Sequence, residues 1–151
     1  MSLIESRSKS LAYRERNMSG WDTGTFDNDD AADWLAELQT TDDEAVLRAA
    51  LEAVDEGEDY LEAPEGARIL CACELVAALT GQAASDLPEI AHEWVEQHQA
   101  LDVSTLVPMA RKGIDRVLAR DSELEELWRE NVDEYPAWRQ NVLTLKARLD
   151  T

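Results

Sequence analysis

Apolar residues recur at helical spacing along most of the chain, and this pattern constrains the fold more than any other feature. Near the end of the chain, Trp138, Val142, Leu145 and Leu149 are spaced four, three and four residues apart, as on one face of an α-helix. No segment alternates apolar and polar residues over the length of a β-strand. The sequence therefore predicts an all-α fold.

Helix start and stop signals divide this pattern into about six to seven helices. Thr41 in TDDE and Ser122 in SELE fit capping boxes, Gly81 fits a left-handed terminator, and Pro64 and Pro136 fit the first turn of a helix. The predicted helices span approximately residues 29–39, 41–55, 64–80, 87–100 and 104–120, and two more begin at Ser122 and Pro136. Their short connections predict a compact bundle.

The length of 151 residues suits one domain with its own core and is short for two. Residues 1–17 differ from the rest, because they hold four basic and two acidic residues and show no sustained apolar period. We interpret them as a flexible extension, either disordered or an artefact of expression or of the start site, with natural translation beginning at Met18. Residues 18–151 are then expected to form a single helical domain.

Acidic residues dominate the composition, with 33 Asp and Glu against 14 Lys and Arg and a net charge of −19. Binding to a phosphate backbone depends on Lys and Arg, so we expect no nucleic-acid partner. The same charge would attract a basic protein surface. No apolar run of membrane-spanning length occurs, and we therefore expect no membrane partner.

Cys71 and Cys73 lie two residues apart in a strongly helical stretch, where their side chains point about 200° apart. They should not pair with each other, and their spacing matches no zinc motif. We interpret them as buried free thiols of a cytoplasmic protein.

The segment WDTGTFDNDDAADW, residues 21–34, is dense in acidic side chains and suggests a calcium loop. An EF-hand loop needs oxygen ligands at alternating positions and a glycine at the sixth. Counting from Asp27 places alanines at the fifth and sixth positions, and counting from Asp22 places Gly24 at the third. Both registers therefore fail.

The same segment fits the chemistry of a helix start. Asp27 or Asn28 would cap the first helix, while Asp29 and Asp30 would meet the positive end of its dipole. Trp21 or Phe26 would pack the entering chain against that helix. A metal or other functional site and a catalytic carboxylate pair, with Asp33 as a further member, are the weaker alternatives.

The stretch HEWVEQH contains two histidines six residues apart, about 240° around a helix, so they cannot share a metal ion from one face. His92 and Glu96 could supply two ligands, but no third is identifiable. We therefore expect neither a metal ion nor another cofactor. His98 continues an apolar seam and is expected to be packed and hydrogen-bonded.

Glu74 lies in the apolar run from Ile69 to Leu79, where burial is costly unless the carboxylate finds a partner. Pairing with an arginine is the favoured interpretation, and the candidates are Arg68, Arg111 and Arg116. Glu74 could instead accept hydrogen bonds from a tryptophan indole or from backbone amides of the opening segment. The remaining alternatives are a general acid or base with a raised pKa and a solvent-facing side chain.

Four of the five tryptophans lie on apolar helical stripes and are expected in the core: Trp34, Trp94, Trp128 and Trp138.

Three stretches together resemble the bacterial domain-of-unknown-function family 4259: GWDTGTFDNDDAADW, ARILCACELVAALTG, and SELEELWREN with WRQNVLTLKARL. The resemblance extends over nearly everything after Met18. It implies a helical domain, and it implies no activity and no catalytic residue.

The chain contains no Gly-rich phosphate loop, no nucleophile elbow and no cysteine beside an obvious histidine base. We therefore predict a non-enzymatic protein-binding module, of the immunity or antitoxin kind, that masks a basic partner surface. The alternative is a hydrolase that uses carboxylates with or without a divalent ion, and a third hypothesis treats the acidic residues as solvated helix surface. The candidate functional cluster comprises Trp21, Phe26, Asp27, Asn28, Asp29, Asp33 and Glu74.

Overall fold

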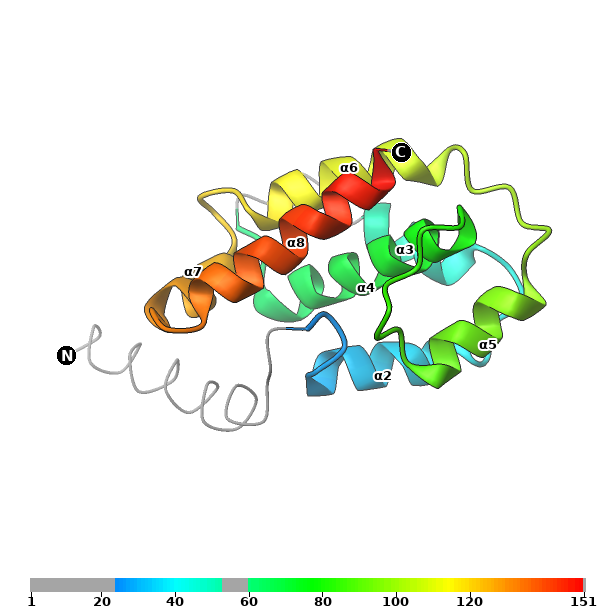
Figure 1. The fold of residues 1–151 in the computed structure, drawn as a ribbon, viewed down its shortest axis with the longest axis horizontal. Helices are drawn as coiled ribbons and strands as arrows, with labels where there is room; N and C mark the ends of the chain where they lie inside the picture. Colours follow the sequence, from blue (N-terminus) through cyan, green and yellow to red (C-terminus); the bar gives the residue numbers. More distant parts are fainter. Residues whose placement is uncertain (1–23, 53–59, 151) are drawn as a thin grey trace.

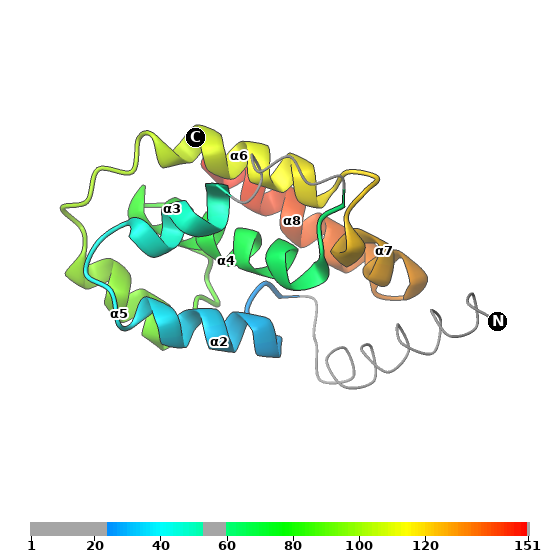
Figure 2. The same ribbon diagram turned by 180° about the vertical axis from the view of Figure 1, so that it is seen from behind.

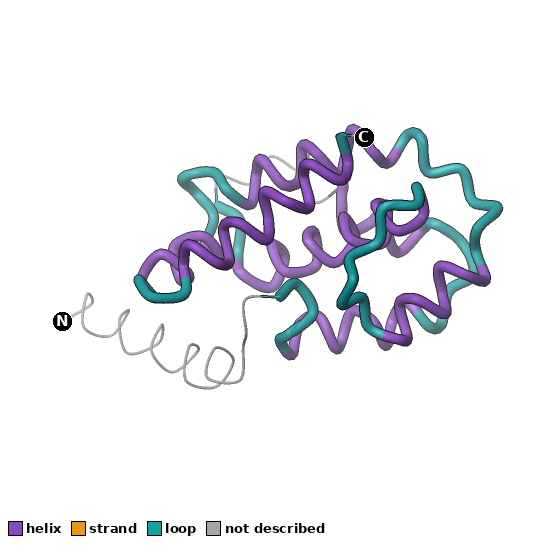
Figure 3. The backbone as a smooth tube through the Cα atoms, in the orientation of Figure 1, coloured by secondary structure: helices purple, strands orange, loops and turns teal. Residues whose placement is uncertain are grey.

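The computed structural model describes residues 24–52 and 60–150, and in this part the chain forms seven α-helices and no β-strand. The helices are α2 (Asp29–Leu38), α3 (Ala45–Glu52), α4 (Ala63–Leu79), α5 (Glu89–Gln97), α6 (Leu106–Val117), α7 (Glu123–Glu130) and α8 (Tyr135–Leu149). The predicted all-α fold is confirmed (Figure 3). Trp21 and the predicted end of the second helix near Asp55 lie outside the described residues.

Helix α4 is the centre of the fold and packs against each of the other six helices. In Figures 1 and 2, α2 and α5 lie on one side of α4, and α6 and α8 lie on the opposite side. The segment from Ile69 to Ala78 is buried throughout. This uniform burial explains why the helix is apolar on all faces, since a helix without a solvent face needs no polar stripe.

Most predicted helix signals are confirmed. Asn28 caps α2, Pro64 lies in the first turn of α4, and Pro136 lies in the first turn of α8. Gly81 follows α4 with a φ of 91°, a left-handed conformation that glycine adopts without steric cost. Ser122 caps α7 by accepting a hydrogen bond from the Glu125 amide at 3.4 Å.

The capping box predicted at Thr41 is wrong. Helix α3 begins at Ala45, whose amide donates to Asp43 Oδ1 at 2.9 Å, and the Thr41 hydroxyl also donates to Asp43. The Thr41 carbonyl accepts from Trp94 Nε1 at 3.1 Å, which holds Thr41 in the connection between α2 and α3. Tertiary contact with α5 therefore displaces the local capping signal.

Two predicted helices are too long. Helix α5 begins only after Pro88, whereas we predicted a start at Leu87, and it ends at Gln97. Helix α6 spans Leu106–Val117 within the predicted 104–120. The connections beside them form turns of their own, in which Ser104 N donates to Asp102 Oδ1 at 3.0 Å.

The four tryptophans predicted for the core are all buried. Trp128 stacks on Trp138 with ring centroids 6.0 Å apart, and Trp94 stacks on His98 at 4.0 Å. His98 Nδ1 also lies 2.7 Å from the Trp94 carbonyl oxygen, so the packed and hydrogen-bonded histidine is confirmed. None of the helices in the described ranges is both long and apolar enough to cross a membrane.

Candidate functional site

The opening turn, residues 24–28, leads directly into α2. Asp27 N donates to the Gly24 carbonyl at 3.2 Å, and Asn28 Nδ2 donates to the Thr25 carbonyl at 3.2 Å. Asn28 Oδ1 accepts from the Ala31 amide at 2.8 Å, which makes Asn28 and not Asp27 the cap. Phe26, one of the two aromatic candidates, is partly buried and packs against the core.

Glu74 is buried, with 5% of its surface exposed, and it is paired with an arginine. Arg148 Nη1 donates to Glu74 Oε1 at 2.9 Å, and Arg148 Nη2 donates to Glu74 Oε2 at 3.0 Å. Arg148 Nη1 also donates to the Gln82 carbonyl at 3.0 Å. The prediction that Glu74 pairs with an arginine is confirmed, but none of the three candidate arginines is the partner.

The candidate arginines have other roles or positions. Arg68 Nε donates to the Pro64 carbonyl one turn earlier, and Arg111 pairs with Asp150 at 2.9 Å. Arg116 lies in the last turn of α6. The last turn of α8 runs beside α4 and brings Arg148 to Glu74, a contact that no local pattern encodes.

Glu74 also meets the opening turn, because the Thr25 hydroxyl donates to Glu74 Oε2 at 3.4 Å. A cleft of about 300 Å³ lies beside this contact. It is lined by Gly24, Thr25, Glu74, Ala84, Ser85, Asp86, Asn141, Thr144 and Arg148. The structure thus joins the opening turn, the centre of α4 and the last turns of α8 in one polar cleft.

A smaller cleft of about 90 Å³ adjoins it and includes Asp27 with Glu74 and Asp86. Asp27 and Asp86 face each other across Gly24, since an oxygen of each lies within 3.8 Å of the position that a Cβ on Gly24 would take. Among the predicted site residues, the structure therefore brings Asp27 close to Glu74. Asp29 and Asp33 lie on α2 and line neither cleft.

Metal-ligating side chains do not cluster in the part of the chain that the structure describes, where no three His, Cys, Asp or Glu residues could hold one ion. His92 Nε2 lies 3.1 Å from Glu96 Oε1 in an exposed pair on α5.

A second buried acid, Glu125 on α7, was missed by sequence reasoning, and 4% of its surface is exposed. Arg129 donates to both of its carboxylate oxygens, at 3.2 and 2.9 Å, and the Tyr135 hydroxyl donates to Oε2. Burial and the hydrogen bond to Glu125 raise the pKa of Tyr135. The stretch SELE predicted a capping box in which Glu125 reaches back to Ser122. Instead, the Glu125 carboxylate is directed toward Arg129 and Tyr135.

Both cysteines are buried free thiols, as predicted. Burial raises the pKa of Cys71 and of Cys73 well above the usual value, and the nearby Glu74 charge adds to the effect. Cys73 Sγ donates to the Ala110 carbonyl at 3.3 Å. These thiols are therefore protonated and packed at neutral pH.

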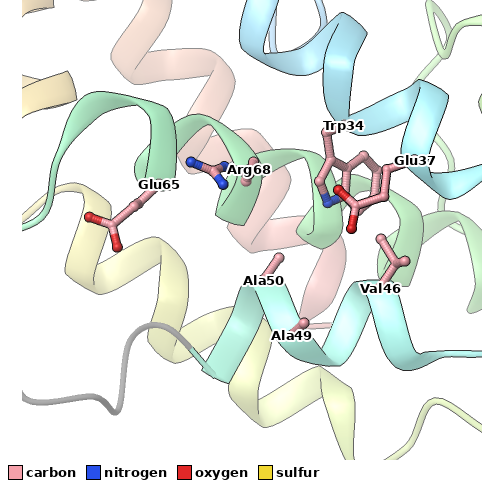
Figure 4. Close-up of a pocket in the computed structure, with 7 residues that line it drawn as sticks. All are labelled: Trp34, Glu37, Val46, Ala49, Ala50, Glu65 and Arg68. Carbon is pink, nitrogen blue, oxygen red and sulfur yellow. The ribbon is translucent and has the colours of Figure 1, made fainter.

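A third hollow, which we call the Trp34 groove, lies between α2, α3 and α4 and has a volume of about 160 Å³ (Figure 4). Its lining residues are Trp34, Glu37, Val46, Ala49, Ala50, Glu65 and Arg68. Alanine and valine side chains of α3 form one wall, and Trp34 and Glu37 of α2 stand opposite them. Sequence reasoning placed Trp34 in the core but did not identify this groove.

Lys and Arg residues are unevenly distributed between the two sides of the bundle. Residues 24–47 contain eight acidic side chains and no Lys or Arg, and residues 69–110 contain six acidic side chains and again no Lys or Arg. These two segments include α2 and α5, which lie side by side in Figures 1 and 2. Eight Lys and Arg residues lie in residues 106–150, which include α6, α7 and α8.

We define the acidic side of the molecule by exposed carboxylates of these two segments. They are Asp27, Asp29, Asp33, Glu37, Asp42 and Asp43 in and beside α2, and Asp86, Glu89, Glu93 and Glu96 in and beside α5.

Comparison with known proteins gives a family match. The model of the family described as "Domain of unknown function (DUF4259)" matches residues 19–141, and no curated protein and no solved structure matches the chain. The family description carries no activity. Because the match extends over most of the chain, this protein belongs to the DUF4259 family.

Proposed function

We propose that this protein is a non-enzymatic binding module whose acidic side docks on a basic surface of another protein. The observation that carries the proposal is the uneven distribution of Lys and Arg. Both segments that form this side lack Lys and Arg, so a cationic partner would meet no like charge there. Complementary charge of this kind speeds association and excludes wrong partners.

The carboxylates of the acidic side are available for such contacts. Asp33 and Glu37 on α2 and Glu93 on α5 are exposed, and no hydrogen bond or ion pair ties their side chains to the described residues. The buried carboxylates Glu74 and Glu125, in contrast, are paired with arginines. These three surface acids therefore contribute little to the fold and remain free to bind.

An immunity or antitoxin role is the specific form that we propose for this binding. A small acidic domain that covers a basic catalytic or nucleic-acid-binding surface would neutralise it without chemistry of its own. The proposal requires no cofactor, no metal ion and no nucleic acid, and it assigns the partner only by its charge.

The test is affinity capture from a lysate of the source cells at low salt, with the full chain as bait. The bait variant combines Asp33→Lys, Glu93→Lys and Asp42→Lys on the acidic side. The matched control combines Asp121→Lys, Asp133→Lys and Glu134→Lys, which are exposed and belong to the α6–α8 part of the chain. Both variants change the net charge equally, so only the position of the change differs.

The expected result is a basic protein that the wild-type chain and the control capture and that the acidic-side variant loses. Capture should also weaken as salt is added, because exposed charges are screened. Equal capture by both variants, or capture that salt leaves unchanged, would contradict the proposal.

A carboxylate-based hydrolase remains the alternative, and the small cleft shared by Asp27, Glu74 and Asp86 is the observation in its favour. Its support is weaker because both Glu74 oxygens accept hydrogen bonds from Arg148. Calorimetric titration with calcium, magnesium, manganese and zinc tests its metal-dependent form, and heat of binding to any of these ions would favour it.

A further inference from the structure

The indole N–H of Trp34 is a buried donor that no protein group of the described ranges accepts. Only 3% of Trp34 is exposed. Trp94 shows the usual arrangement, since its Nε1 donates to the Thr41 carbonyl at 3.1 Å. Buried tryptophan N–H groups normally have a partner, and an unmet donor is costly. The Trp34 N–H is therefore open to an acceptor that does not belong to the described residues.

The donor is directed into the Trp34 groove. Figure 4 shows the indole nitrogen on the side of the ring that faces the space between Arg68 and Ala50. Glu37 stands beside the ring and is exposed, and its carboxylate has no hydrogen bond or ion pair within the described ranges. The groove thus places the indole N–H of Trp34 near the carboxylate of Glu37, and neither group has a partner within the described ranges.

The other lining residues define the middle of the groove and its far end. Val46, Ala49 and Ala50 form an apolar wall that can cover a hydrocarbon stem. At the far end, Glu65 accepts from the Glu62 amide at 3.2 Å, and Arg68 donates to the Pro64 carbonyl. These contacts engage Glu65 Oε1 and Arg68 Nε near the start of α4, whereas no hydrogen bond or ion pair of the described ranges engages the Glu37 carboxylate.

An occupant that fits needs an oxygen acceptor, an apolar stem and a cationic head. A lysine or arginine residue of a polypeptide has all three, since its backbone carbonyl accepts, its methylenes are apolar and its head is charged. The volume of about 160 Å³ is small for a drug-sized ligand and suits a single residue.

We propose that the Trp34 groove binds one lysine or arginine residue of the basic partner. The backbone carbonyl of that residue accepts from Trp34 Nε1, its stem lies on the α3 wall, and its head pairs with Glu37. This inference rests on the proposed function and adds the anchoring residue and its site.

The direct test is a titration of the ¹⁵N-labelled full chain with the peptide acetyl-Gly-Arg-Gly-amide. The indole N–H signal of Trp34, assigned with Trp34→Phe, reports on the groove, and the indole signal of Trp94 is the internal control. We expect the Trp34 signal to shift in a saturable way at millimolar peptide, while the Trp94 signal stays in place. The same peptide with citrulline in place of arginine should bind more weakly, because it lacks the charge.

The matched pair of variants is Glu37→Gln and Glu93→Gln. Both remove one exposed carboxylate from the acidic side, but only Glu37 lines the groove. We expect Glu37→Gln to weaken peptide binding roughly fivefold, as for loss of an exposed ion pair, and Glu93→Gln to leave it nearly unchanged.

Three outcomes would overturn the inference: no shift of the Trp34 signal up to ~10 mM peptide, equal binding of the citrulline peptide, or equal effects of the two variants. The last two would indicate non-specific attraction to the acidic side.

If the captured partner is lost with the acidic-side variant but retained by Trp34→Phe and Glu37→Gln, the inference fails while the proposed function stands. If no basic partner depends on the acidic side, the proposed function fails.

Discussion

Arg148 in the last turn of α8 donates two hydrogen bonds to Glu74 at the centre of α4, at 2.9 and 3.0 Å. Only 7% of the Glu74 side chain and 20% of the Arg148 side chain are exposed. The pair therefore lies in an environment where water does little to screen it. Together with the Thr25 hydroxyl, it connects the opening turn, the central helix and the end of the chain.

Removing the charge of Arg148 should destabilise the protein strongly, because Glu74 would be left as an unpaired buried charge. We expect Arg148→Met to lower the free energy of unfolding by about 3 kcal/mol. The double variant Glu74→Leu with Arg148→Met should lose less, since no charge remains buried. Urea denaturation followed by circular dichroism measures both values.

Arg111→Met is the control for this prediction. Arg111 pairs with Asp150 at 2.9 Å, but both side chains are about half exposed. A surface pair of this kind is worth about 0–1 kcal/mol. Equal losses for Arg148→Met and Arg111→Met would show that the Glu74 pair is not energetically distinct.

The Tyr135 hydroxyl should contribute more to stability than the Tyr60 hydroxyl, although each donates to a glutamate. The acceptor of Tyr135 is the buried Glu125, whereas Glu126, the acceptor of Tyr60, is exposed. We expect Tyr135→Phe to lower the free energy of unfolding by about 1–3 kcal/mol and Tyr60→Phe to change it by less than about 0.5 kcal/mol. A larger loss for Tyr60→Phe in urea denaturation would contradict this ranking.

Local signals predicted the helices well because their causes are local. Asn28, Gly81 and Pro136 act on the backbone within a few residues of themselves, and each is found in its predicted role. The apolar period likewise predicted the buried tryptophans. Ile90 is apolar but 38% exposed, because α5 buries Ala91, Trp94 and Val95 and Ile90 falls beside that stripe.

The partners of the buried acids could not be predicted, because they depend on how the helices pack. Glu74 and Arg148 are 74 residues apart in the chain, and no periodicity relates them. Glu125 and Arg129 are one helical turn apart, which is also the spacing of an ordinary surface pair. This pair differs from a solvated one because the chain turns back at Tyr135, and Tyr135 covers the Glu125 carboxylate.

The Trp34 groove was hidden for a related reason. The period places Trp34 on a buried stripe, and that placement is correct. Whether its indole N–H finds an acceptor depends on groups from α3 and α4, which no pattern in α2 encodes.

Asn28 should stabilise α2 through its cap, since Asn28 Oδ1 accepts from the Ala31 amide at 2.8 Å. We expect Asn28→Ala to lower the free energy of unfolding by about 1 kcal/mol. Asp27→Ala is the neighbouring control, because Asp27 is exposed and does not cap the helix, and it should change stability by less than about 0.5 kcal/mol. Thermal denaturation compares the two variants. A larger loss of stability for Asp27→Ala would contradict the assignment of Asn28 as the cap.

The two buried thiols should make the protein less stable in alkali. Burial raises the pKa of Cys71 and Cys73 above the unfolded value, so the folded state keeps protons that the unfolded state releases. Their contribution to stability is therefore full below the unfolded thiol pKa of about 8.5 and falls as the pH rises above it. Each thiol should lower the free energy of unfolding by about 1.4 kcal/mol per pH unit in that range.

Urea denaturation at intervals between about pH 8 and pH 10 measures this slope, and the double variant Cys71→Ala with Cys73→Ala is the control. The variant loses some packing at every pH, so the comparison uses the slope and not the absolute stability. We expect the free energy of unfolding to fall more steeply with pH in the wild-type protein than in the double variant. The difference should equal the contribution of two thiols, because both are fully buried. Parallel slopes would mean that the thiols ionise in the folded protein as readily as in the unfolded chain. That result would contradict their place in the core beside Glu74.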